Sequence, residues 1–371
     1  MGRNMATRVA LDAIVVTLLM FLVTKVASDD ADPIPWDKLQ LSAWFDKNVG
    51  PAKERTGLDP ALAVAESKPP KIINVKQDGS GDFNTIGDAI KSVPRNNPYR
   101  IIISIAGGTY VEKLLVDHYQ TFLTLYGDPN DIPVLSYNGD AKTYGTTQSG
   151  TLTVEATADY FMAVNLIIVN TTPRPDGRLL AQALAVRMSG KNGAYYNVKM
   201  HGYQDTLCDD SGYHFFKDCY IEGTVDFIFG NSKSLYLNTE LHVLEGTTPV
   251  DVITAHANED PNADLGFSFV HCSVTGNTTK TYLGRTWRSH PKVIFSFTEM
   301  GDIVNPLGWS SLSRPLYRKT AYFAEFKNRG PGATPEQRAS YVKKLSDADA
   351  KPFISLAHIN ASSWLLPPPK L

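Results

Sequence analysis

The chain has 371 residues, 43% of them hydrophobic and 20% charged, an ordinary balance for one large globular domain or two smaller ones. The 17 Tyr and 16 Phe residues favour β structure. A formal net charge of −2 excludes the generally basic surface of a nucleic-acid-binding protein, and it allows a polyanionic ligand only where positive charge gathers locally.

The first 28 residues are typical of an export signal. Arg3 and Arg8 precede an apolar stretch from Ala13 to Val23, and Val26-Ala27-Ser28 offers small residues for cleavage. The alternative is a membrane anchor, but about 11 apolar residues are too few to span a bilayer. Removal of residues 1–28 moves the formal charge from −2 to about −4. We therefore expect a secreted protein without membrane attachment after signal cleavage.

Residues 29–70 form a polar extension punctuated by prolines. Short helices are expected over Trp36 to Asn48 and near Pro60 to Glu66. About 40 residues cannot build a core of their own, so this segment either packs on the main domain or forms a loose arm. The main domain is expected at residues 71–371, after the Lys68–Lys71 stretch.

Short apolar strands separated by Gly, Asn, Asp and Pro follow residue 71. Helical periodicity appears only at Pro335 to Asp347. The clearest strand candidates are Ile101–Ile103, Phe122–Leu125, Thr151–Val154 and Val293–Phe295.

Five segments repeat the pattern apolar–x–x–anchor–x–apolar. Their anchors are Asn165, Val198, Cys219, Thr239 and Cys272, at spacings of 33, 21, 20 and 33. The two longer spacings contain the loop-like stretches Thr171–Arg178 and Glu259–Leu265. A period near 21 without helices predicts an all-β chain wound as a single-stranded parallel β-helix. The rival, a β-sandwich, would need hairpin turns between neighbouring strands, and the repeats are joined by longer irregular turns instead.

Polar residues inside the strand-like runs recur with the same period. Gln182 and Gln204 are 22 residues apart, and Asp205 and Asp226 are 21 apart. Because stacked strands lie about 4.8 Å apart, one circuit brings such residues side by side. The alternative for each residue alone is a turn cap or a structural ladder.

Asp226 lies between Val225 and Phe227 in an apolar run, where a carboxylate needs a partner to offset its desolvation. The candidate cation is Arg285, two to three circuits further along. These residues together predict one polar site on one face of the coil.

The three cysteines, Cys208, Cys219 and Cys272, make a poor disulfide framework, and whether Cys208 pairs with Cys219 stays open. With no paired Cys-x-x-Cys, a structural zinc site is not expected, and we expect no metal or cofactor. Asn170, Asn277 and Asn360 begin glycosylation triplets.

Five ordered motifs resemble the plant pectinesterases, also called pectin methylesterases. They are GGTYVEK (Gly107 to Lys113), QALAV (Gln182 to Val186), YQDTL (Tyr203 to Leu207), GTVDFIFG (Gly223 to Gly230) and LGRTW (Leu283 to Trp287). The resemblance covers residues from about Ile72 to Trp364, and the short leader and the Trp-Leu-Leu-Pro-Pro-Pro ending are most similar to the pollen-type branch that lacks an inhibitor-like pro-region.

The resemblance implies a right-handed parallel β-helix and hydrolysis of methyl esters on galacturonate units in the plant cell wall. It implies that Asp226 is a nucleophile forming an acyl-enzyme, Asp205 the acid and then the base, and Arg285 the residue that positions Asp226. Gln182 and Gln204 would donate to the oxyanion. The expected substrate contacts are Gln182, Arg285, Trp287, Phe229 and Thr147.

The expected partner is methyl-esterified homogalacturonan, the expected state is a monomer, and a proteinaceous pectinesterase inhibitor is a further expected partner. Four positions depart from the family pattern, and the first is Thr286, a small residue where the family usually has Pro or Ala before the tryptophan. Cys208 replaces an aromatic residue that contacts substrate in many members, Gln148 replaces another aromatic residue, and Thr239 replaces a cysteine, so no bridge to Cys272 can form.

Two alternatives remain. Another pectin-active β-helix enzyme is one, but the chain lacks the Asn-Thr-Asp and Gly-His-Gly motifs of polygalacturonases and the dense Asp/Glu cluster of calcium-dependent lyases. A catalytically inactive wall-binding relative is the other, and the presence of all five main site residues argues against it. A serine hydrolase or a zincin is disfavoured because Gly-x-Ser-x-Gly and His-Glu-x-x-His are absent.

Overall fold

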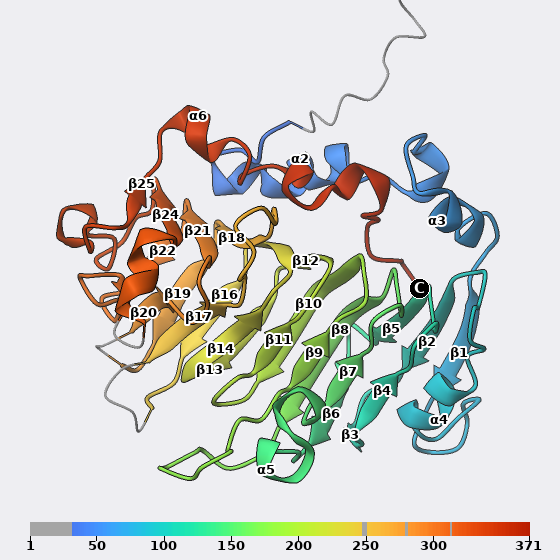
Figure 1. Cartoon of the computed structure of the whole chain (residues 1–371). Helices are drawn as coiled ribbons and strands as arrows, with labels where there is room; N and C mark the ends of the chain where they lie inside the picture. The colour runs from blue at the N-terminus through green and yellow to red at the C-terminus, as the bar shows by residue number, and fades with distance from the viewer. Residues whose placement is uncertain (1–31, 247–250, 279–280, 312–313) are drawn as a thin grey trace, which may run out of the picture.

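Parallel strand pairing dominates the computed structural model, which describes residues 32–246, 251–278, 281–311 and 314–371. The expected signal, residues 1–28, lies outside this range. Successive circuits stack into a parallel β-helix, as the period near 21 predicts, and Figure 1 shows the strands advancing side by side from β1 to β25.

Two sheets form the walls of the coil. The 8-stranded sheet has the order β23-β20-β17-β14-β11-β9-β7-β4. Its strands are β4 (Leu114–Val116), β7 (Leu152–Val154), β9 (Val186–Met188), β11 (Leu207–Asp209), β14 (Val225–Gly230), β17 (Val252–His256), β20 (Tyr282–Arg285) and β23 (Trp309–Ser310). The other sheet has 17 strands. They are β1 (Lys71–Val75), β2 (Ile101–Ile105), β3 (Thr109–Val111), β5 (Leu123–Gly127), β6 (Val134–Tyr137), β8 (Met162–Asn170), β10 (Gly193–His201), β12 (Tyr213–Lys217), β13 (Tyr220–Gly223), β15 (Lys233–Leu237), β16 (Glu240–Val243), β18 (Gly266–Val270), β19 (Ser273–Gly276), β21 (Lys292–Ser296), β22 (Glu299–Met300), β24 (Tyr322–Phe326) and β25 (Lys343–Lys344).

Helices are short and peripheral. They are α2 (Leu41–Asn48), α3 (Pro60–Ala65), α4 (Ile86–Lys91), α5 (Ala141–Tyr144) and α6 (Asp347–Ala350), with 3-10 turns at Lys38–Gln40, Ala52–Glu54, Thr146–Gln148, Pro315–Lys319, Pro335–Gln337, Leu356–Ile359 and Ala361–Ser363. No helix in the described ranges is both long and apolar enough to cross a membrane.

An aromatic ladder runs through the interior of the coil beside many buried aliphatic side chains. Its rings belong to Tyr195, Phe216, Tyr236, Phe269 and Phe295, with centroids 4.8, 4.5, 4.4 and 4.5 Å apart from one ring to the next. Each ring lies on a different circuit in the same register. Stacking at the strand spacing fills the interior and fixes the register that the site needs.

The repeat anchors are confirmed except for the first. Val198 pairs with Leu166 rather than with Asn165. Asn165 lies instead at a corner in the left-handed conformation with φ 52°, next to Asn197, also with φ 52°. The Asn197 amide donates to the Asn165 side-chain oxygen over 2.9 Å. Asparagine tolerates the left-handed conformation better than most other residues with a Cβ. The residue is therefore explained by its place at the corner, and Leu166 takes the register position of the anchor.

The helical periodicity at Pro335 to Asp347 does not produce a helix across that range, and the prediction is wrong there. Only a 3-10 turn, β25 and the start of α6 fall in it. Tyr341 and Val342 pack against the interior, and β25 extends the sheet beside β24. The need to cover the end of the coil overrides the local pattern.

The described part of the extension, residues 32–70, packs on the coil and is not a loose arm. Figure 1 shows this extension and the C-terminal segment, the residues that follow β25, crossing the same side of the molecule. Trp44, Phe45 and Leu62 are buried in a cluster with residues of the 17-stranded sheet and of the C-terminal segment. Arg55 ties the two segments, donating to the carbonyl oxygens of Leu365 at 2.8 Å and Ser362 at 2.6 Å.

Replacing Arg55 with methionine should lower the free energy of unfolding by about 1.5–3 kcal/mol, since hydrogen bonds from a charged donor are lost. Urea denaturation followed by fluorescence measures this change. Lys53→Met, at an exposed position in the same segment, is the matched control and should have little effect. Equal stability of the two variants would contradict the role given to Arg55.

Candidate active site

The predicted acids lie side by side where the chain enters the 8-stranded sheet. Leu207 of β11 pairs with Ile228 of β14, which sets Asp205 level with Asp226. The Asp205 amide donates to the Val225 carbonyl over 3.1 Å. The 21-residue spacing therefore makes the two acids neighbours on adjacent circuits, as predicted.

Both acids occupy unusual backbone conformations. Asp205 has φ 66° and Asp226 has φ 51°, in the left-handed region that costs a residue with a Cβ about 1 kcal/mol or more. The register of β14 against β17 also shifts between Val225 and Ile228, as at a β-bulge. Bulges re-aim side chains, and here Phe227 and Ile228 both join the interior core while Asp226 remains with the polar site.

Arg285 holds Asp226 through both carboxylate oxygens. Its Nε donates to Oδ1 over 2.7 Å and its Nη2 to Oδ2 over 2.6 Å. Arg285 lies two strands beyond β14, and in register the small Ala255 separates it from Phe229. Burial works to lower the pKa of Arg285, but the hydrogen bond and charge of Asp226 outweigh it and raise that pKa. The ion pair gives Asp226, which is only 7% exposed, a charged partner within the fold.

Asp205 has the opposite electrostatic setting. It is 8% exposed, and no described residue forms an ion pair with it at 4 Å or less. Burial first, and then the negative charge of Asp226, raise the pKa of Asp205 well above its usual range, while Arg285 opposes the shift. Two adjacent carboxyl groups thus lie in different electrostatic settings, one paired with an arginine and one not, the arrangement that can separate an acid from a nucleophile.

Gln204 directly precedes Asp205, and Gln182 lies beside Gln204 on the preceding circuit. The Ala183 amide donates to the Gln204 carbonyl over 3.1 Å, so Gln182 lies beside Gln204, as the 22-residue spacing predicts. The side-chain oxygen of Gln182 is buried and has no hydrogen-bond partner in the described structure. Such an unsatisfied buried acceptor is costly, and the Gln182 oxygen is therefore not held by a protein donor among the described residues.

Asn170 holds the backbone around these glutamines. Its side-chain amide donates to the carbonyls of Gly139 and Leu184, each over 2.8 Å. The residue is 3% exposed, so it is not an accessible glycosylation acceptor, and that prediction is wrong at this position. Asn277 and Asn360 are exposed.

The two predicted aromatic contacts differ in accessibility. Trp287 is partly exposed, with the guanidinium carbons of Arg285 and Arg288 at 6.0 and 5.1 Å from its ring centroid. Phe229 is 6% exposed and meets Trp287 edge-on at 6.0 Å and 76°. Phe229 therefore supports Trp287 and offers no open face to a sugar, which corrects the prediction. The role of Arg288 was missed, although it directly follows Trp287.

Other predicted features lie apart from the acids. Thr147 is exposed in the 3-10 turn that precedes β7, and the structure shows no hydrogen bond from it to the acids. Cys208 is buried under Trp287 with Phe229, and all three cysteines are free, so Cys208 does not pair with Cys219. Within the described ranges, no three His, Cys, Asp or Glu side chains cluster as metal ligands.

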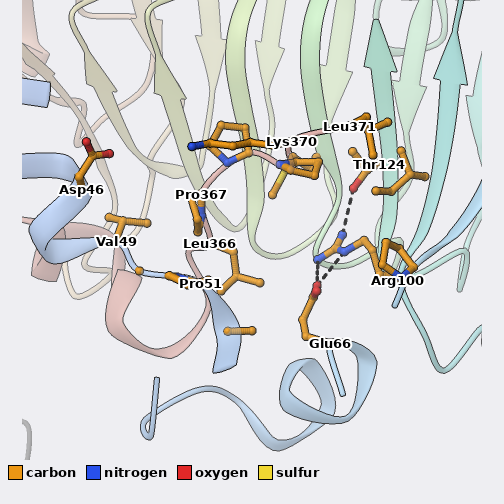
Figure 2. Close-up of a pocket in the computed structure, with 17 residues that line it drawn as sticks. Asp46, Val49, Pro51, Glu66, Arg100, Thr124, Leu366, Pro367, Lys370 and Leu371 are labelled. Carbon is orange, nitrogen blue, oxygen red and sulfur yellow. Dashed lines mark hydrogen bonds and ion pairs between the residues drawn. The ribbon is translucent and has the colours of Figure 1, made fainter. Parts of the chain in front are cut away.

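A separate cavity of about 580 Å³ lies between the N-terminal extension, the C-terminal segment and the 17-stranded sheet. Figure 2 shows Arg100 at its wall, joined to Glu66 and Thr124. Arg100 also donates to the Tyr160 carbonyl over 2.7 Å, so its hydrogen-bonding groups are already occupied. None of the predicted catalytic residues lines this cavity.

Comparisons with known proteins show the family of the chain. The family model described as Pectinesterase matches residues 72–362. Pectinesterase 2 of Olea europaea is 51% identical over 363 residues, which is 97% of this chain and 98% of the relative, and Probable pectinesterase 50 of Arabidopsis thaliana is 47% identical over 96% of this chain and 98% of the relative.

Solved structures of pectin methylesterases share the fold. The carrot enzyme superposes with a TM-score of 0.73 at 27% identity, covering 81% of this chain and 95% of that one. A pectin methylesterase mutant solved in complex with a hexasaccharide superposes with a TM-score of 0.67 at 25% identity, covering 81% of this chain and 100% of that one.

Proposed function

Because this chain belongs to the pectinesterase family and removes the methyl esters of pectin, we propose that Asp226 is its nucleophile and Asp205 its proton-transfer group. The observation that supports this proposal best is the different environment of two adjacent acids. Asp226 is clamped by Arg285, whereas burial and the negative charge of Asp226 raise the pKa of Asp205 and favour its protonated form.

In the first step, a carboxylate oxygen of Asp226 attacks the ester carbonyl carbon. The tetrahedral intermediate collapses, the bond to the methoxy oxygen breaks, and Asp205 gives its proton to that oxygen, so methanol leaves. The product of this step is an anhydride between Asp226 and the galacturonate unit. Arg285 fixes both oxygens of Asp226 and thereby orients the attack.

In the second step, Asp205, now ionised, takes a proton from water as the water oxygen attacks the acyl carbon. The bond to Asp226 breaks, which regenerates its carboxylate and its ion pair with Arg285. Asp205 is protonated again, and the galacturonic acid unit of the polymer leaves with a free carboxyl group. Each acid thus returns to its starting state after one turnover.

Negative charge on the carbonyl oxygen needs hydrogen-bond donors in both steps. Gln182 and Gln204 lie on adjacent circuits next to Asp205, and each side-chain amide carries two N–H groups that can donate. We assign both amides to the oxyanion. Trp287, flanked by Arg285 and Arg288, is assigned to sugar stacking, and the exposed Thr147 to a contact further along the polymer.

Replacing Gln182 with alanine should reduce kcat by about 10²–10³, because one oxyanion donor is lost. Steady-state methanol release from esterified pectin measures this reduction. Gln148→Ala, at an exposed position in the preceding circuit, is the control and should retain activity. A change confined to KM would contradict the oxyanion role.

We also propose that the protein works in the plant cell wall as a monomer, after secretion and removal of residues 1–28. The apolar stretch from Ala13 to Val23 supports secretion. Methyl-esterified homogalacturonan is its polymeric partner in this proposal, and a proteinaceous pectinesterase inhibitor is a second.

A further inference from the structure

Lys113 is a half-buried cation without a counter-ion in the described structure. It occupies the turn between β3 and β4, and its Nζ lies 5.2 Å from the centroid of the Tyr144 ring. No hydrogen bond or ion pair joins its ammonium group to another described residue. Burial lowers the pKa of Lys113, while the charges of Tyr144 and Glu155 oppose that shift.

The carboxylates near Lys113 are engaged elsewhere. Glu112 accepts hydrogen bonds from the amides of Ile86 at 3.0 Å and Gly87 at 2.8 Å, at the start of α4. Glu155 pairs with Arg187 at 3.6 Å. No described carboxylate therefore forms an ion pair with Lys113. A half-buried ammonium group is attracted more strongly to a carboxylate than a fully solvated one is.

Tyr144 is 40% exposed and is held in place from two sides. Its hydroxyl shares a 2.7 Å hydrogen bond with that of Tyr137. Tyr144 also ends α5, whose first residue, Ala141, donates its amide to the Gln182 carbonyl over 2.8 Å. The short helix that carries the Tyr144 ring is thus hydrogen-bonded to the backbone of a candidate oxyanion residue.

The pair lies on the same edge of the 8-stranded sheet as the acids. The Leu114 amide at the start of β4 donates to Thr151, and the Thr151 amide donates to Leu184. β4 is four strands from β14 in the order of the sheet, which corresponds to about 19 Å at the usual spacing. Trp287 with its arginines lies beyond Asp226, so a cation and an aromatic ring occur on each side of the acids.

We propose that Lys113 and Tyr144 form a distal subsite that binds the free carboxylate of a galacturonate unit already stripped of its methyl ester. This inference rests on the proposed function. A methyl ester is neutral and cannot form an ion pair with an ammonium group. The product of each turnover carries a carboxylate, which can serve as the counter-ion of Lys113. The subsite therefore directs the enzyme to esters a few sugar units away from a demethylated stretch.

Rates on oligogalacturonides of equal length test the subsite, with one substrate fully methyl-esterified and the other demethylated at one end. Wild type should show the higher kcat/KM on the partly demethylated chain. Lys113→Gln should reduce this preference by about fivefold, the equivalent of about 1 kcal/mol for a partly exposed ion pair. Its rate on the fully esterified chain should not change, and Lys113→Arg should keep the preference.

Lys142→Gln is the matched control, since it removes the same charge from an exposed position of α5. Equal preferences in Lys113→Gln and wild type, or an equal loss in Lys142→Gln, would overturn the subsite. Oligomers too short to span about 19 Å should show no effect of Lys113→Gln, and an effect there would also overturn it. Absence of methanol release by wild type from every substrate would instead refute the proposed function.

Discussion

Asp226→Asn should reduce methanol release by about 10³-fold or more. The amide matches the carboxylate in size but is not a nucleophile, so the acylation step is lost. The carboxylate is clamped through both oxygens by Arg285, and asparagine retains one acceptor for that clamp. Methanol produced from esterified pectin by purified protein measures the loss, and circular dichroism verifies the fold.

Asp302→Asn is the control for this experiment, because Asp302 is an exposed acid outside the candidate site. It should retain wild-type activity. A rate for Asp226→Asn within a few-fold of wild type would show that another group attacks the ester.

Asp205→Asn should reduce kcat by about 10²–10⁴, because the leaving methoxide loses its proton donor. It should also stabilise the fold near neutral pH. Burial and the charge of Asp226 raise the pKa of Asp205 in the folded state, so the folded protein binds a proton more tightly than the unfolded chain. Stability then decreases as pH rises from the unfolded pKa through the folded pKa.

The asparagine variant has no carboxyl group to titrate at position 205. The part of the pH dependence of stability that comes from Asp205 should therefore be absent. Thermal melts of both proteins across weakly acidic to neutral pH measure the difference. A variant that is inactive and less stable at neutral pH would contradict the raised pKa. Full activity of Asp205→Asn would contradict its role in proton transfer.

Much of the fold and of the site could be predicted from the period of the chain. The 21-residue distance from Asp205 to Asp226 equals the register offset of β11 and β14. The distance from Gln182 to Gln204 is one residue longer, and the Thr206 carbonyl accepts from both Ala185 and Val186, which accommodates the extra residue. Spacing predicts such contacts because each circuit repeats the same backbone path.

Features that depend on three-dimensional packing could not be predicted in this way. The repeat pattern predicts Asn165 as an anchor, but the residue lies at a corner in the left-handed conformation. The resemblance predicts Phe229 as a substrate contact, but Trp287 covers it. Lys113 gave no signal by itself, because an unpaired charge becomes visible only when the partners of Glu112 and Glu155 are known.

The central claim is that Asp226 and Asp205 act on the same methyl ester. A crystal structure of Asp226→Asn with a methyl-esterified oligogalacturonide tests this claim most directly. The ester carbonyl carbon should lie about 3–3.5 Å from the side chain at position 226, with the methoxy oxygen within hydrogen-bond reach of Asp205. An oligosaccharide bound only in the cavity beside Arg100, or an ester facing away from both side chains, would contradict the mechanism.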